Sequence, residues 1–334
     1  MLSRAFTTPR KSFRYGETSC RSASIHEYED CIIGFMDDPP LKNCNDVPGA
    51  IHLTLREVLR GSVGVVGQSR LGMIEKVVLL GGQVCSLKRF REVSVKRIEF
   101  GRRIQRLAEI SKQCKYLVPV TSYLYTRRIK FVVSHYFPMG SLADLLAGAR
   151  ELGHTALDWK QRLKIVFHMA RAIAFIHGQS PSQEKHLILN VHGNIKSSNV
   201  MINCDFDASI SDYGFVQLAE RVKVSDICQV KPPLDSQPRL YIDSFSQKCD
   251  IYNFGIILLD LLAGHTSSES KNEIIEKKEE IKNGKCQFFE FPTTGKARKQ
   301  ALKVLDIALA CTNNSPDARP SMEQILLYLG DIIK

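Results

Sequence analysis

The chain is 334 residues long; 44% of its residues are hydrophobic, 24% are charged, and its formal net charge is +11. This composition is that of an ordinary globular protein, and it excludes a disordered tail protein, a collagen and a coiled-coil rod. The longest apolar stretch, 256–262, contains Asp260 and is far shorter than the roughly 20 residues that span a bilayer. No transmembrane helix is therefore predicted.

Ten cysteines are scattered along the chain, and no two of them form a C-x-x-C pair. Zinc sites and small disulfide frameworks need closely spaced cysteines, so neither is predicted. Because the chain also starts without an apolar signal segment, the cysteines are interpreted as reduced thiols of a cytoplasmic protein.

Residues 1–50 are rich in Ser, Thr, Arg and Cys and lack apolar periodicity, which predicts a flexible basic extension before the folded domain. The first 26 residues contain five Lys or Arg and a single acid, Glu17, so an organellar transit peptide is an alternative. Leu2 excludes myristoylation, whereas Cys20 and Cys31 are candidate acylation sites.

Short β-like runs with Gly-rich punctuation follow over 51–136. The runs on either side of Gly81-Gly82 predict a hairpin with a tight two-residue turn, and further strands are expected over 116–125 and 131–137. One helix is expected over 93–110, with an inward face made of Val95, Ile98, Leu107 and Ile110.

From Gly140 onward the periodicity becomes helical. Helices are expected over 157–177, 248–263, 273–282, 296–311 and 321–333, and Pro320 is a start signal for the last of them. The apolar side of the first helix is predicted to consist of Leu163, Ile165, Val166, Met169, Ile173 and Ile176. The pattern indicates a small sheet with one helix, joined to a larger helical lobe.

The most informative segment is Val-His-Gly-Asn-Ile-Lys-Ser-Ser-Asn over 191–199, followed by Asp212-Tyr213-Gly214. It predicts a lysine, an asparagine and an aspartate at the mouth of a short strand pair. An amide oxygen and a carboxylate are ligands suited to Mg²⁺, and a nearby ammonium group suits a phosphate.

With this segment the sequence resembles a eukaryotic protein kinase domain, most closely the cytoplasmic domains of plant leucine-rich-repeat receptor-like kinases. The narrower resemblance also uses Tyr-Phe-Pro-Met-Gly-Ser-Leu (136–142), Cys-Asp-Ile-Tyr-Asn-Phe-Gly (249–255) and Asp-Ala-Arg-Pro-Ser-Met (317–322). It covers about residues 55–333. The resemblance implies an α+β, bilobal protein kinase-like fold, with an N-lobe over 51–136 and a C-lobe over 137–334.

The resemblance implies a nucleotide site between the lobes. The glycine-rich loop that folds over the ATP phosphates matches Gly67 and Gly72, with Ser69 in place of the middle glycine; a plain hairpin would explain the same two glycines. Lys88 matches the strand lysine that contacts the α- and β-phosphates, with an exposed strand-end lysine as the alternative. The positions implied around the adenine are Ser86, the small gatekeeper Ser134, and the hinge residues His135 and Phe137.

Phosphate and metal positions are also retained. Lys196 matches the residue that steadies the γ-phosphate, Asn199 the second metal ligand and Asp212 the principal Mg²⁺ ligand. ATP and Mg²⁺ are therefore the implied cofactors, and weak binding is expected because the side chain of Ser69 narrows the approach of backbone N–H groups to phosphate. Tyr213 replaces the usual Phe and adds a hydroxyl that needs a partner.

The catalytic loop departs from the family. The His-Arg-Asp of active kinases is His192-Gly193-Asn194 here, so a neutral amide replaces the aspartate that accepts the substrate proton. General-base assistance worth about 10²–10⁴-fold is thereby lost. The missing arginine removes the cation that would pair with a phosphorylated activation loop.

The helix glutamate that pairs with the strand lysine is also absent. Its position is Arg103, which is expected to repel Lys88. Glu99 lies one helical turn earlier on the same face and could substitute only if the helix slid.

The activation segment, 212–239, contains the serines Ser225 and Ser236 but no threonine. Asp250 matches the buried aspartate that holds the catalytic-loop backbone, with a helix N-cap as the alternative. With a one-residue gap, Arg239 occupies the place of a glutamate that pairs with the arginine matching Arg319, so these two residues are expected to repel.

Between Leu87 and Lys130 the chain contains 13 Lys or Arg and three Glu. This block indicates an anionic partner, with an anionic membrane surface among the candidates, or else an ordinary solvated face. Nucleic acid is not expected, because no base-stacking aromatic residues are interleaved with the basic ones. The resemblance implies other receptor-like kinases or signalling proteins as partners, and a cytoplasmic location that is peripheral at the plasma membrane if the basic block or acylation provides contact.

The altered catalytic positions and the retained nucleotide positions together favour a pseudokinase that binds ATP and acts as a signalling scaffold or allosteric regulator. The alternatives are a weakly active Ser/Thr kinase, in which Asn194 suffices because the loose transition state demands little base catalysis, and a binding module without nucleotide.

Overall fold

The structure is a computed structural model, and it describes residues 41–44, 53–180, 187–219, 245–263, 271–286, 288–292 and 294–333. Residues 39–334 form one compact unit. The predictions for 1–40, and those for Ser225, Ser236 and Arg239 in the activation segment, lie outside the described residues.

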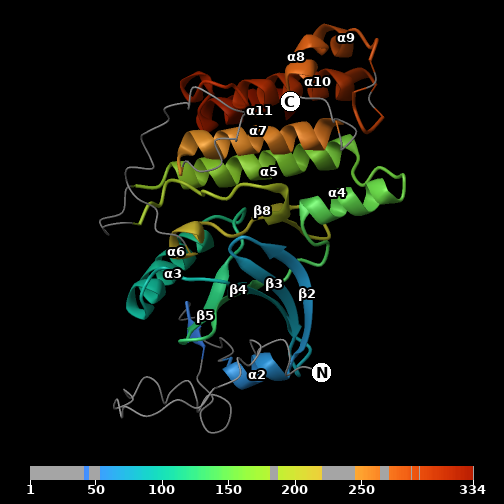
Figure 1. The fold of residues 1–334 in the computed structure, drawn as a ribbon. Helices are drawn as coiled ribbons and strands as arrows, with labels where there is room; N and C mark the ends of the chain where they lie inside the picture. The colour runs from blue at the N-terminus through green and yellow to red at the C-terminus, as the bar shows by residue number, and fades with distance from the viewer. Residues whose placement is uncertain are drawn as a thin grey trace, which may run out of the picture. The chain divides into compact units, whose positions relative to one another are not determined.

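The N-lobe is a six-stranded antiparallel sheet (Figure 1) with the strand order β1-β5-β6-β4-β3-β2. β1 pairs with β5 through Lys42 and Tyr123, so the sheet includes residues assigned from the sequence to the N-terminal extension. The strands are β1 (Lys42–Asn43), β2 (Ser62–Ser69), β3 (Gly72–Val78), β4 (Val84–Phe90), β5 (Val120–Tyr125) and β6 (Lys130–His135).

The turn between β3 and β4 is longer than predicted. The Leu79 N–H donates to the Gln83 carbonyl at 2.9 Å, so the ladder continues beyond the two strands and residues 80–82 form the turn. Leu80 is 79% exposed at its tip, and Gly82 has a φ of +80°, a conformation that favours glycine. The predicted two-residue turn was wrong because Leu80 leaves the strand.

One long helix, α3 (Arg97–Lys112), packs against β5. It begins four residues later than predicted, because the preceding Ser94 is bonded elsewhere: its N–H donates to the Leu218 carbonyl at 2.9 Å. Val95 accordingly precedes the helix. The predicted inward face was also partly wrong, since Ile98 is 80% exposed. It lies two residues, or about 200° around the helix axis, from the buried Phe100.

A second N-lobe helix, α2 (Leu55–Arg60), is absent from the sequence prediction. Its first turn carries a capping box, in which the Glu57 N–H donates to Thr54 Oγ1 and the Thr54 N–H donates to the Glu57 carboxylate. The Thr-x-x-Glu spacing is a recognised helix-start signal and would have predicted this helix.

The C-lobe is mainly helical (Figure 1). The predicted helix over 273–282 is divided at Lys277 into two short helices. The elements are α4 (Leu142–Glu151), α5 (Trp159–His177), η2 (Ser197–Asn199), β7 (Val200–Ile202), β8 (Ala208–Ile210), α6 (Val216–Ala219), α7 (Gln247–Ala263), α8 (Lys271–Glu276), α9 (Lys278–Lys282), α10 (Gly295–Cys311), η5 (Pro316–Ala318) and α11 (Met322–Ile333).

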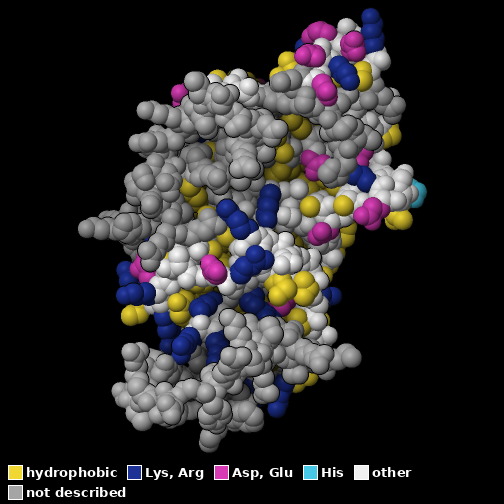
Figure 2. Space-filling view, viewed as in Figure 1, with side chains coloured by type: hydrophobic (Ala, Val, Ile, Leu, Met, Phe, Trp, Pro, Cys, Tyr) yellow, Lys and Arg dark blue, Asp and Glu magenta, His cyan; other side chains and the backbone are white. Residues whose placement is uncertain are grey.

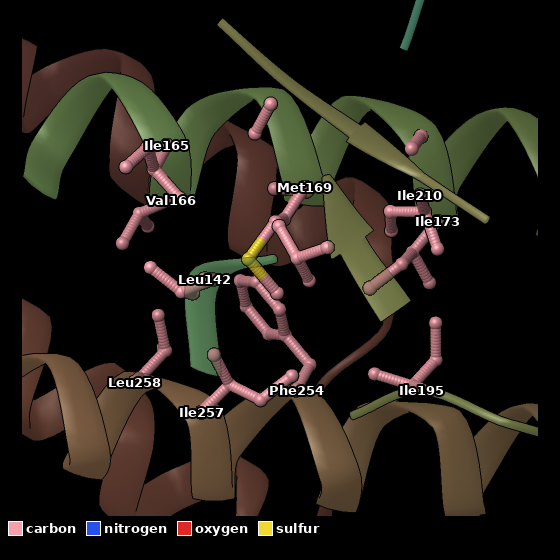
Figure 3. Packing of buried hydrophobic residues seen from close by; sticks show 14 of the residues in the cluster. Leu142, Ile165, Val166, Met169, Ile173, Ile195, Ile210, Phe254, Ile257 and Leu258 are labelled. Carbon is pink, nitrogen blue, oxygen red and sulfur yellow. The ribbon is translucent and has the colours of Figure 1, made fainter. Parts of the chain in front are cut away.

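The core of the C-lobe lies between α5 and α7. Figure 3 shows Phe254 of α7 against Met169 of α5, with Leu142 and Ile210 contributed by other elements. All six residues predicted for the apolar side of α5 are buried, as their spacing of three and four residues requires. This core supports the loop that precedes β7.

A buried arginine was not predicted. Arg162 on α5 has no exposed side-chain surface; it donates to the backbone carbonyls of Leu157 and Leu261 and lies 3.0 Å from Glu290. Glu290 also pairs with Arg150 at 2.6 Å. Although burial alone would raise the pKa of Glu290, its two guanidinium partners hold that pKa below its ordinary value.

Among the described residues, none of the helices combines the length and the apolarity that a bilayer crossing requires.

Candidate functional site

The two lobes meet around a cavity of about 40 Å³. Its walls include Leu107 of α3 and apolar residues of β3, β5 and β6. The predicted nucleotide-site residues that line it are Ser86, Lys88, Ser134, His135 and Asp212, whereas Gly67, Gly72, Phe137, Asn194, Lys196 and Asn199 do not.

Lys88 is buried in the cleft and already has partners on both sides. Its ammonium group lies 3.0 Å from the Asp212 carboxylate and 3.0 Å from Ser69 Oγ. Because Ser69 occupies the middle position of the glycine-rich loop, its hydroxyl binds the lysine that the family uses for phosphate. Lys88 is 5% exposed, which excludes the strand-end alternative.

Arg103 does not contact Lys88, contrary to the expected repulsion. Its guanidinium donates to the Glu99 carboxylate at 2.7 Å and to the Gln217 carbonyl at 2.7 Å. The charge of Arg103 is therefore compensated within α3, and Glu99 is held away from the role of a substitute glutamate. The hydrogen bond from Arg103 to the Gln217 carbonyl therefore joins α3 to α6. It takes the place of the ion pair that active kinases form between the helix glutamate and the strand lysine.

The side chain of Gln217 joins α6 to the segment that precedes the catalytic loop, and sequence reasoning missed this residue. Its side-chain carbonyl accepts the Ile188 N–H at 2.7 Å, and its amide donates to the Ile188 carbonyl at 2.8 Å. Tyr213, as expected for its added hydroxyl, donates to the Leu189 carbonyl. Burial raises the pKa of Tyr213, so the phenol stays protonated as a donor.

The backbone of the catalytic loop is held by Asp250, as the sequence predicts. The carboxylate accepts the N–H groups of His192 at 2.8 Å and Gly193 at 2.9 Å, and it lies 3.1 Å from His177 Nε2. The buried His192 ring lies 3.0 Å from the Ser211 carbonyl and accepts the Asn194 N–H at Nδ1. Burial lowers the pKa of His192, which keeps the ring neutral in this geometry.

Asn194 stands where the family has the proton-accepting aspartate. Its backbone carbonyl accepts from the Asn199 side-chain amide at 2.8 Å. Its own Nδ2 is buried and has no hydrogen-bond partner among the described residues. The amide can bind an acceptor such as a hydroxyl oxygen, but it has no charge with which to take up a proton.

Gly193, in place of the loop arginine, is enclosed by an aromatic side chain. Its φ is +76°, and a Cβ added there would lie 2.0 Å from Cε2 of Phe245. Phe245 is itself buried, at the point where the chain returns from the activation segment. An arginine at this position would therefore require both a different backbone conformation and displacement of the ring.

The β7–β8 pair places Asn199 and Asp212 next to each other. Val200 pairs with Ile210, and the Asn199 carbonyl accepts the Ser211 N–H at 2.8 Å. These are the two expected metal ligands.

The two expected ligands suit a divalent cation that also binds waters and substrate phosphates. Asp212 gives one carboxylate, which already pairs with Lys88, and Asn199 gives one neutral amide. Mg²⁺ sites usually add waters and substrate phosphates to one or two carboxylates. The described part of the chain contains no group of three or more His, Cys, Asp or Glu side chains suited to a metal ion.

Positive charge is also present near Asp212, which pairs with Lys88 at 3.0 Å. Burial lowers the pKa of Lys196, Asp212 opposes this effect, and the charges of Lys88 and Arg70 add to it. Arg70 is exposed at the turn between β2 and β3, next to Ser69. These cations come from both lobes.

In the glycine-rich loop, glycine is sterically required at Gly72 but not at Gly67. Gly72 has a φ of +149°, and a Cβ there would lie 1.9 Å from the Arg89 carbonyl oxygen, so close packing of β3 on β4 requires glycine. Gly67 has no neighbour nearer than 3.7 Å to such a Cβ.

At the hinge, the backbone carbonyl of Phe137 accepts the Gly140 N–H at 3.0 Å, in the turn that leads to α4.

The protein kinase domain family model matches residues 61–328. The probable inactive receptor kinase RLK902 of Arabidopsis thaliana is 30% identical over 292 residues, which cover 83% of this chain and 43% of RLK902. The chain thus spans less than half the length of the first curated relatives it matches.

Two solved structures have the same fold. The pseudokinase domain of BIR2, described as an immune regulator of the RLK/Pelle family, superimposes with a TM-score of 0.72 at 23% identity, covering 90% of this chain and 92% of that one. The kinase domain of maize SIRK1, bound to AMP-PNP, gives a TM-score of 0.70 at 25% identity, covering 88% and 100%. The bilobal fold, the order of the site residues and the family match agree, and the chain belongs to the protein kinase domain family.

Proposed function

We propose that this chain is a pseudokinase domain that retains a nucleotide site, transfers phosphate too slowly to act as an enzyme, and regulates other receptor-like kinases or signalling proteins by contact. The observation that carries the proposal is Asn194. A neutral amide occupies the position of the proton acceptor, in a loop whose backbone is otherwise held by Asp250.

No second acid is placed to take over this role among the described residues around the cavity. Asp212 is the one carboxylate that lines it, and its Oδ2 lies 3.0 Å from the Lys88 ammonium. A general base must reach the proton of the incoming hydroxyl and be free to accept it. A carboxylate paired with a buried ammonium group is not free to accept that proton.

The position of α3 supports the same proposal. The bond from Arg103 to the Gln217 carbonyl joins the helix to the start of the activation segment, so Lys88 has no glutamate partner on α3. Kinases of this family position the ATP phosphates with that ion pair. The name of RLK902, a probable inactive receptor kinase, agrees with this interpretation for a relative of 30% identity.

A regulatory role is tested by adding the purified chain to the kinase domain of an active plant receptor-like kinase. We expect a saturable change in the phosphorylation rate of the active kinase, and an equal change with the Lys88→Met variant, because contact rather than phosphate transfer produces it. The matched control is heat-denatured chain at the same concentration. No change at saturating concentration for any receptor-like kinase partner tested would count against regulation by contact.

A weakly active Ser/Thr kinase is the second candidate, because Asn194 Nδ2 has no hydrogen-bond partner among the described residues and would donate to a substrate hydroxyl oxygen once the loop exposes it. In that case radiolabelled phosphate would reach a peptide slowly, and the Lys88→Met variant would abolish the label. The pseudokinase proposal predicts equal background labelling for both proteins.

The basic block supports a peripheral location near an anionic surface. Nine of its 13 cations are exposed, whereas Lys88, Arg89, Arg103 and Lys130 are buried or half-buried, and Figure 2 shows many Lys and Arg side chains on the N-lobe. Sedimentation with phosphatidylserine vesicles at low and high salt tests this. Binding that disappears at high salt is expected, and absence of binding at low salt would indicate an ordinary solvated face.

A further inference from the structure

The turn between β2 and β3 carries a hydroxyl at the position where the family's loop has its middle glycine. Ser69 ends β2 and pairs with Gly72 at the start of β3. The turn between these two residues is joined to the end of β4, because the Leu71 carbonyl accepts the Arg91 N–H at 3.0 Å. The backbone of the turn is therefore fixed beside β4, the strand that carries Lys88.

The Ser69 hydroxyl is used both as a donor and as an acceptor. Its O–H donates to the Gly72 carbonyl at 3.2 Å, and its oxygen accepts from the Lys88 ammonium group at 3.0 Å. A serine hydroxyl has a single donor, so the bond to the carbonyl directs the oxygen lone pairs toward the ammonium group. The contact between Ser69 and Lys88 is therefore supported by the fold of the hairpin.

The ammonium group of Lys88 has only three N–H groups to donate. One is directed to the Asp212 carboxylate at 3.0 Å, and another to Ser69 Oγ at 3.0 Å. Both Lys88 and Asp212 are buried, which limits the access of water to this pair. The two described partners leave one N–H group for any further acceptor.

A nucleotide needs more than one of these donors. The family resemblance implies that Lys88 contacts both the α- and the β-phosphate, which requires two N–H groups. A carboxylate holds an ammonium group more strongly than a neutral hydroxyl does, so Asp212 is the partner that stays and Ser69 is the partner that is displaced. The glycine of the family's loop has no side-chain oxygen and does not compete for the lysine.

We propose that Ser69 sets the affinity of the nucleotide site for phosphates, because its hydroxyl occupies the Lys88 donor that a second phosphate group would use. The inference rests on the proposed nucleotide site. Rotation about the Cα–Cβ bond of Ser69 releases this donor without movement of the turn, whose backbone bond through Leu71 does not involve the serine side chain. Each binding event then breaks the bond between Ser69 and Lys88, so phosphates bind less tightly than they would with alanine at this position.

The test compares ATP with adenosine as ligands of the full chain in buffer containing Mg²⁺, by calorimetry and by thermal shift. In the Ser69→Ala variant we expect the affinity for ATP to rise about three- to tenfold, the range that corresponds to one competing hydrogen bond. Adenosine has no phosphate, so its affinity should stay unchanged. The matched control is Ser62→Ala, which removes an exposed hydroxyl at the other end of β2 and should change neither affinity.

A second background tests whether Ser69 acts through the lysine. In Lys88→Met the gain from Ser69→Ala should disappear, and a gain that persists would contradict the inference. Equal ATP affinity of the unaltered chain and Ser69→Ala would overturn the inference and leave the nucleotide site intact. An equal gain for ATP and adenosine would also overturn it, because the hydroxyl would then act on the whole cavity. No ATP binding by either protein would remove both the inference and the nucleotide site.

Discussion

Replacement of Gly193 by alanine tests the packing that distinguishes this catalytic loop from the family's. The added Cβ would lie 2.0 Å from Phe245 Cε2 and 2.4 Å from its Cδ2, and the backbone φ of +76° is unfavourable for any residue with a side chain. Two separate costs therefore follow from one methyl group. The first is backbone strain, and the second is movement of a buried ring.

The magnitude follows from these two costs. A left-handed conformation costs an L-residue roughly 1–2 kcal/mol. To reach ordinary contact, the ring edge must retreat from 2.0 to 3.4 Å, which loosens a side chain that is only 6% exposed. Complete loss of a buried Phe costs about 3–5 kcal/mol, and a partial displacement costs a fraction of that. We expect Gly193→Ala to lower the free energy of unfolding by about 2–5 kcal/mol.

The assay is equilibrium urea denaturation, with Gly67→Ala as the matched control because nothing lies within 3.4 Å of its added Cβ. In a Phe245→Ala background the ring is gone, so Gly193→Ala should cost only the strain, about 1–2 kcal/mol. If Gly193→Ala is as stable as Gly67→Ala, or costs the same with and without Phe245, the ring does not occupy the space of the missing arginine side chain.

Three further predictions concern buried polar groups. Asp250→Asn should destabilise the fold by about 3 kcal/mol in urea denaturation, because two charge-assisted bonds from the catalytic-loop backbone are weakened; a loss under 1 kcal/mol would contradict this. Arg162→Met should cost about 3–5 kcal/mol by the same measurement, since Glu290 loses a buried partner and two carbonyls lose their donor, and an unchanged midpoint would refute that role. Burial lowers the pKa of His168, whose Nδ1 accepts the Ala208 N–H, so the unfolded chain takes up a proton that the folded one does not as pH falls below about 6.5. The free energy of unfolding should therefore decrease from pH 7 to pH 5, and His168 should contribute up to about 1.4 kcal/mol per pH unit to this decrease. The His168→Asn variant should lack this contribution. Identical slopes of unfolding free energy against pH for the two proteins would exclude the role of His168.

Much of the fold could be predicted because its signals are local. The three- and four-residue spacing of apolar residues defined α5, and the motif order defined the two lobes. The start of α3 could not be predicted, since it depends on the bond between Ser94 and Leu218, which are 124 residues apart. The length of the β3–β4 turn depends on the hydrogen bond from the Leu79 N–H to the Gln83 carbonyl. The two glycines in the sequence do not specify that bond.

The site residues were identifiable, but their partners were not. Sequence position alone predicted that Arg103 repels Lys88, whereas its guanidinium group donates hydrogen bonds to the Glu99 carboxylate and the Gln217 carbonyl. A side chain with three or more rotatable bonds can reach several neighbours, and only the packed structure selects among them. Likewise, Ser69 suggested weaker phosphate binding, yet its hydrogen bond to Lys88 requires the folded hairpin.

The most direct test of the central claim is a single-turnover reaction with radiolabelled ATP and a generic peptide substrate, with the protein in excess over nucleotide so that slow transfer is visible. The chain should leave the label on ATP over hours, at the level of the Lys88→Met variant. Transfer to the peptide or to the chain itself, at a rate that Lys88→Met abolishes and Asn194→Asp does not increase, would contradict the claim that the missing carboxylate disables catalysis.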